Sequence, residues 1–149
     1  MDFSIVWQYL PIMLEGAWVT LWITVVSLVI GLAVAIPLAL ARLAKNPFIA
    51  SPAYVFVLYF RGTPLLVQIF LIYYGSGQFR LELTDLGLWG FFRDPWFCGI
   101  LALVLNTAAY SAEIFRGAIA AVPRNDIEAG RACGMSGLLL FRRINLPKA

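Results

Sequence analysis

The sequence contains no histidine and only two cysteines among its 149 residues. Histidine is the commonest general base of enzymes, and its absence argues against an intramembrane enzyme. No group of residues has metal-ligand spacing, and no glycine-rich phosphate loop of the G-x(4)-G-K-S/T kind is present. We therefore expect no catalytic residue, no metal and no bound cofactor in this chain.

Charged residues are also scarce. They make up 13% of the chain, whereas 62% is hydrophobic, which is more apolar surface than a soluble domain needs. The composition predicts an all-α integral membrane protein. Residues 1–15 carry no lysine or arginine, so a signal peptide is not expected. No repeat or low-complexity tract divides the sequence, and we expect a single domain over residues 1–149.

Three apolar stretches are long enough to cross about 30 Å of hydrocarbon. They cover residues of about 16–41, 53–79 and 95–117. A plain membrane anchor is the alternative for the first. Most lysines and arginines follow the first or the third stretch, and only Arg80 and Arg93 lie on the other side. The positive-inside rule then places the N-terminus outside the cell and residues of about 118–147 in the cytoplasm.

Two ionisable residues lie within or beside these stretches, which is costly in a membrane and points to function. Arg61 belongs to the run 61–64 (RGTP), where glycine and proline predict a broken helix. The alternative is an arginine that extends to the lipid headgroups. Glu113 precedes Arg116 by three residues, so the two side chains are close enough to pair, and a simple salt bridge is the alternative there. Asn106, Tyr110 and Glu113 share one helix face, which we expect to point at a pore or a partner.

A short polar element follows the third stretch. Asn125 or Asp126 is a candidate cap for its first helix, and Gly134 is placed to end that helix in a left-handed conformation. Ser136 is a candidate cap for a second short helix. Pro147 marks a break or a new helix start. An amphipathic interfacial helix is the alternative interpretation.

The end of the sequence resembles the EAA loop of the membrane permeases of bacterial ABC importers, whose motif is E-A-A-x(3)-G-x(9)-I-x-L-P. The matching residues are Glu128, Gly134, Ile144, Leu146 and Pro147. Gly130 stands where the second alanine is usual, and we expect the missing methyl group to loosen the helix. The resemblance implies a coupling helix that docks in a groove of a cytoplasmic ATPase. The residues that it assigns to ATPase coupling are Glu128, Ala129, Gly130, Gly134, Ile144, Leu146 and Pro147.

Two more segments resemble the polar amino acid branch of these permeases: residues 61–68 (RGTPLLVQ) and 106–117 (NTAAYSAEIFRG). The similarity covers residues of about 18–149 and is greatest to permeases for histidine, lysine, arginine, ornithine and opines. The substrate-pathway candidates that follow are Arg61, Thr63, Pro64, Gln68, Asn106, Tyr110 and Glu113.

The resemblance implies a type I ABC importer transmembrane fold with a periplasmic N-terminus. Three of an expected five spans are present, so we expect the chain to be incomplete at its C-terminus. The implied function is import of a polar or basic amino acid, or of an opine, across the bacterial inner membrane. The implied partners are a second permease subunit, identical or related, a periplasmic substrate-binding protein, membrane lipid and a separate ATPase dimer that uses ATP and magnesium; no nucleic acid is expected. A passive channel or scaffold without ATPase coupling is the alternative, and ATP dependence of uptake distinguishes the two.

Overall fold

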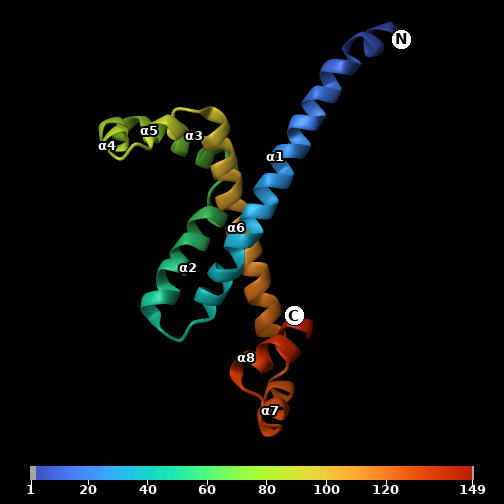
Figure 1. Ribbon diagram of the computed structural model, residues 1–149, viewed down its shortest axis with the longest axis vertical. Coiled ribbons are helices and arrows are strands. Elements are labelled where there is room, and N and C mark those ends of the chain that lie inside the picture. The colour runs from blue at the N-terminus through green and yellow to red at the C-terminus, as the bar shows by residue number, and fades with distance from the viewer. Residues whose placement is uncertain (1–2, 149) are drawn as a thin grey trace. The chain divides into compact units, whose positions relative to one another are not determined.

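The computed structural model describes residues 3–148, with side chains from Trp7 onward (Figure 1). Every regular element in this range is helical and none is a strand, so the predicted all-α fold is confirmed. The longer helices are α1 (Phe3–Leu43), α2 (Pro47–Gly62), α3 (Leu65–Ser76) and α6 (Pro95–Ala121). The shorter elements are the 3₁₀ turn η1 (Gly77–Phe79), α4 (Arg80–Asp85), α5 (Trp89–Phe92), α7 (Arg124–Ala132), α8 (Gly137–Leu140), the π-helical turn η2 (Phe141–Asn145) and α9 (Leu146–Lys148).

Two helices are long and apolar enough to cross a membrane: residues Trp7–Leu43 of α1, and α6. A third span exists if the helix pair Pro47–Gly62 and Leu65–Asp85 forms one broken span. The first helix extends beyond the predicted 16–41 at both ends, and α6 continues past residue 117 to Ala121. The number of spans and their orientation stay predictions.

The predicted break in the second apolar stretch is confirmed. Helix α2 starts at Pro47, where the side chain of Asn46 accepts a hydrogen bond from the backbone N–H of Phe48 at 3.0 Å. It ends at Gly62, because Thr63 is extended with φ −115° and ψ 143°. A residue that precedes a proline disfavours the helical region, so Pro64 explains why the chain leaves the helix here and starts α3 at Leu65.

The chain divides into two compact units, which we describe separately. The first comprises the described residues up to Gly31 together with Leu65–Thr107. Helices α1 and α6 approach closely here, since a β-carbon added to Gly31 would lie 2.8 Å from the β-carbon of Thr107. Asn106 Nδ2 donates a hydrogen bond of 3.2 Å to Oε1 of Gln68, whose side chain is 1% exposed. This buried amide pair fixes α3 on α6, because an amide that lost its partner in apolar surroundings would be costly.

The second unit comprises the described residues of Leu32–Pro64 and of the part from Ala108 onward. Its core joins α1, α2 and α6 through four small or branched apolar side chains, which are Ala35, Ala39, Val57 and Ala112. Alanines one helical turn apart on α1 allow this close packing. Beyond the end of α6 the chain folds into a compact group of short helices, α7 to α9 (Figure 1). We call this group, residues 124–148, the C-terminal hairpin.

Candidate functional site

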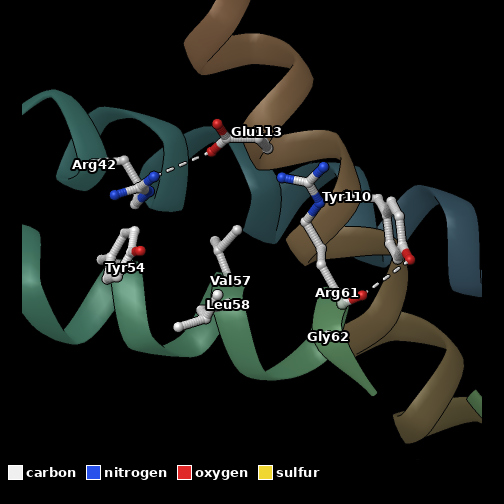
Figure 2. Close-up of a pocket in the computed structure, with 8 residues that line it drawn as sticks. All are labelled: Arg42, Tyr54, Val57, Leu58, Arg61, Gly62, Tyr110 and Glu113. Carbon is white, nitrogen blue, oxygen red and sulfur yellow. Dashed lines mark hydrogen bonds and ion pairs between the residues drawn. The ribbon is translucent and has the colours of Figure 1, made fainter. Parts of the chain in front are cut away.

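Helices α1, α2 and α6 of the second unit border a pocket of about 370 Å³ (Figure 2). The pocket contains two arginines and a glutamate in segments that are otherwise apolar. Its lining residues are Arg42, Tyr54, Val57, Leu58, Arg61, Gly62, Tyr110 and Glu113. Because charges in such segments are costly, this pocket is the strongest candidate site outside the C-terminal hairpin.

Glu113 is held by two arginines. Its Oε2 accepts a hydrogen bond from Nη2 of Arg42 at 3.3 Å. Its Oε1 accepts from Nε and Nη2 of Arg116 at 2.9 and 2.6 Å. The predicted pairing of Glu113 with Arg116 is therefore confirmed. The ion pair with Arg42 links α6 to α1, and nothing in the sequence around either residue indicates it. Both oxygens of the carboxylate are engaged within the protein.

Each arginine of the pocket lies over a tyrosine ring. The guanidinium of Arg42 is 4.6 Å from the ring centre of Tyr54, and that of Arg61 is 5.5 Å from the ring centre of Tyr110. The hydroxyl of Tyr110 also donates a hydrogen bond of 3.4 Å to the backbone oxygen of Arg61, which joins α6 to the last turn of α2 (Figure 2). These cation–π contacts orient both guanidinium groups.

Three of the seven predicted pathway residues line this pocket: Arg61, Tyr110 and Glu113. Thr63 lies at the break, where its hydroxyl donates to the backbone oxygen of Tyr59 at 2.8 Å, and Pro64 follows it. The other two, Gln68 and Asn106, form the buried pair of the first unit. Arg42 and Tyr54 were not among the predicted residues, because their place in the pocket arises from the packing of α1 and α2.

The C-terminal hairpin turns at Gly134, whose φ is +75°. The backbone N–H of Gly134 bonds to the oxygen of Arg131 at 2.9 Å, and that of Met135 bonds to the oxygen of Gly130 at 3.1 Å. This is the Schellman pattern, which requires a left-handed residue after the helix and so favours glycine. The predicted end of the first short helix at Gly134 is confirmed.

The predicted start of that helix is wrong. Helix α7 begins at Arg124, directly after Pro123, so Asn125 and Asp126 lie inside its first turn instead of capping it. Asp126 pairs there with Lys148 of α9 at 2.7 Å, a contact that the local sequence does not indicate. Ser136 does precede α8 as expected, but its side chain makes no capping hydrogen bond in the structure described.

Gly130 is a contact point within the hairpin. A β-carbon added to it would lie 2.5 Å from Cδ1 of Ile144 and 3.3 Å from Cδ1 of Leu140. These side chains fill the space of the missing methyl group, and the expected loosening of the helix stays a prediction. The motif residues Gly130 and Ile144 thus pack α7 against η2.

The remaining motif residues belong to the same hairpin. Glu128 and Ala129 are exposed on α7, and Leu146 and Pro147 open α9. The predicted break or new helix start at Pro147 is wrong, because the backbone continues in a helical conformation from η2 through Leu146, with φ −65° and ψ −42°, into Pro147. The hairpin presents an exposed helix with two acidic and two basic residues. Its orientation against its neighbours is set by Gly130, Gly134 and the Asp126–Lys148 pair.

Residues 27–149 match the family described as the inner membrane component of binding-protein-dependent transport systems. The chain belongs to this family. It is 54% identical, over its whole length, to the nopaline transport system permease protein of Agrobacterium fabrum, of which it covers 62%. It is 48% identical to the octopine transport system permease protein of Rhizobium meliloti over 96% of this chain and 58% of that protein.

A third relative is the histidine/lysine/arginine/ornithine transport system permease protein of Salmonella typhimurium, 47% identical over 90% of this chain and 57% of that protein. The chain is also similar to the crystal structure of an amino acid ABC transporter with histidines, with a TM-score of 0.82 and 32% identity over 99% of this chain and 64% of that one. The chain thus spans about three fifths of the length of these curated relatives. The resemblance to permease subunits of ABC importers is confirmed.

Proposed function

We propose that this chain is the transmembrane subunit of an ATP-driven importer that moves an amino acid or an opine across the bacterial inner membrane. Membership of the inner membrane component family supports this, and so do relatives named for nopaline, octopine and basic amino acid transport. The single observation that carries the proposal is the C-terminal hairpin. Its Gly134 turn and its Gly130–Ile144 contact give the motif residues one defined arrangement.

In this proposal the hairpin lies in the cytoplasm and the N-terminus in the periplasm, with three spans between them. The excess of lysine and arginine after the first and third spans supports that orientation. Glu128 and Ala129 are exposed on α7 and suit a partner groove. We assign Glu128 a charged or hydrogen-bonded contact with the ATPase.

The chain has no phosphate-binding loop, so ATP and magnesium would bind to a separate ATPase dimer. A second permease subunit, identical or related, completes a pathway between the spans, and a periplasmic binding protein delivers the amino acid. Closure of the ATPase dimer moves the docked hairpin and rocks the helices that continue from it, which gives alternating access to a site near the midplane.

The substrate pathway in this proposal includes the pocket of the second unit, with Arg61, Tyr110 and Glu113. The break at Thr63-Pro64 supports it, because interrupted helices are common at the binding sites of transporters. Gln68 and Asn106 contribute by holding α3 on α6.

The test is uptake by the purified complex, reconstituted in liposomes together with its partner ATPase and binding protein. We expect the ATPase to co-purify with the chain, and labelled arginine, histidine or nopaline to accumulate with ATP and not with ADP. Equal uptake with either nucleotide would favour the passive channel. A chain that binds no ATPase and supports no uptake would contradict the proposal.

A further inference from the structure

The pocket of the second unit contains more positive than negative charge. Its lining residues include the guanidinium groups of Arg42 and Arg61 but only one carboxylate, that of Glu113. Arg116 adds a third guanidinium from behind, through its two hydrogen bonds to the same carboxylate. Arg42 and Glu113 are largely buried, whereas Arg61 is exposed, so the guanidinium of Arg61 is accessible to an anion from outside the chain.

The two pocket arginines differ in what they bind. Arg42 is committed to Glu113 and lies over Tyr54. Within residues 3–148, the ion pairs join Arg42 and Arg116 to Glu113, and Lys148 to Asp126, so the guanidinium of Arg61 takes part in none. It rests instead on the ring of Tyr110, with its donors directed into the pocket beside Glu113 (Figure 2).

Donors outnumber acceptors elsewhere in the pocket too. The Nε atom of Arg42 is buried and finds no hydrogen-bond acceptor in the described part of the chain. Glu113 does not serve as that acceptor: its Oε2 accepts from Nη2 of Arg42, and its Oε1 accepts from Nε and Nη2 of Arg116. Two arginines already neutralise the charge of Glu113, so a ligand ammonium group gains little from it. A ligand carboxylate instead meets the guanidinium of Arg61, which forms no ion pair within residues 3–148.

We propose that Arg61 binds the carboxylate of the transported amino acid in this pocket, with Tyr110 positioning the guanidinium and Glu113 remaining the internal counter-ion of Arg42 and Arg116. This inference rests on the proposed import of amino acids or opines. An arginine suits the task because its planar group donates two parallel hydrogen bonds to a carboxylate. The pocket therefore recognises the acidic end of the substrate and not its basic side chain.

The experiment compares an amino acid with its carboxamide, which keeps the side chain but removes the negative charge. The probes are L-arginine and L-argininamide, or L-histidine and L-histidinamide if the complex imports histidine. Dissociation constants are measured on the purified membrane complex without the periplasmic binding protein, because that protein has its own specificity. The readout is the ratio of the carboxamide constant to the amino acid constant.

We expect a ratio of about 10 to 100 for the native complex, from a charge-assisted bond of the usual strength. Arg61→Gln should bring the ratio to within about threefold of one, and Arg61→Lys should retain part of it because the charge remains without the fork. Glu113→Gln should raise the ratio, because it removes a negative charge and leaves Arg42 and Arg116 without their counter-ion. The matched control is Arg80→Gln: Arg80 also lies 5.5 Å from an aromatic ring, that of Trp89, but outside the pocket, and its loss should leave the ratio unchanged.

If Arg61 had a purely structural role, Arg61→Gln would weaken the binding of both probes equally and leave the ratio of their dissociation constants unchanged. That result would overturn the proposal. So would a ratio near one in the native complex, whatever the variants do. If Arg61→Gln fails to assemble, an Arg61→Lys complex with the native ratio and unchanged affinities counts against the proposal in the same way. A native complex that imports neither amino acid with ATP contradicts the proposed function itself, whereas import with an unchanged ratio contradicts only the role of Arg61.

Discussion

Arg42, near the end of α1, and Glu113, in the second half of α6, form an ion pair of 3.3 Å across 71 residues of sequence. The two side chains are 16% and 20% exposed, so water screens the pair only in part. The pair joins two helices of the second unit beside its alanine-rich core, and it fixes the carboxylate that also receives Arg116. The pairing of Glu113 with two arginines therefore stabilises the arrangement of α1 and α6 around the pocket.

The ion pair predicts strong coupling between its two residues. We expect Glu113→Gln to lower the free energy of unfolding in detergent by about 1–3 kcal/mol, less than the cost of breaking a fully buried pair, because two arginines lose their acceptor. Arg42→Gln should cost a similar amount. The double variant should cost clearly less than the sum. Additivity of the two single changes to within about 0.3 kcal/mol would contradict a direct interaction.

The turn at Gly134 predicts that its conformation is needed for coupling. A leucine in the left-handed conformation that this position requires costs about 1–2 kcal/mol. That cost shifts the equilibrium between the native turn and other conformations of the hairpin by about five- to thirtyfold. We expect Gly134→Leu to lower the number of amino acids imported per ATP by a similar factor while ATP hydrolysis continues.

The matched control for that variant is Gly137→Leu, three residues further along the same hairpin. Gly137 is not among the glycines with positive φ, and a β-carbon added to it meets nothing within 4 Å. Its replacement by leucine should leave the import per ATP near the native value. Equal effects of the two substitutions would mean that bulk on the hairpin surface matters and the left-handed turn does not.

Features set by the backbone could be predicted from the sequence. The break before Pro64 and the helix end at Gly134 both follow from residues with restricted or unusual φ. The start of α6 at Pro95 follows from the same logic, and Asp94 caps it by accepting from the backbone N–H of Trp96 at 3.0 Å. The contact of Glu113 with Arg116 was predictable because one helical turn separates them.

Contacts between distant segments could not be predicted. Three contacts arise only when helices pack: the ion pairs Arg42–Glu113 and Asp126–Lys148, and the packing of Gly130 against Ile144. The start of α7 was misplaced for a related reason: Asp126 is a good capping residue in isolation, yet the helix begins right after Pro123 and uses this carboxylate for Lys148. Composition also cannot tell which polar residues line a pocket and which, like Gln68, are buried between helices.

The side of the membrane on which the hairpin lies can be measured with a thiol that the protein already has. Cys133 is exposed on the hairpin next to Gly134, whereas Cys98 is buried in the first unit. A membrane-impermeant maleimide is added to intact spheroplasts and to inside-out vesicles, with and without the ATPase, and a Cys133→Ser variant reports any labelling at Cys98. The proposed docking predicts labelling of Cys133 only in inside-out vesicles, at a rate that the ATPase lowers. Labelling from the outer face of spheroplasts, or a rate that the bound ATPase leaves unchanged, would contradict the proposal that this hairpin couples the spans to ATP hydrolysis.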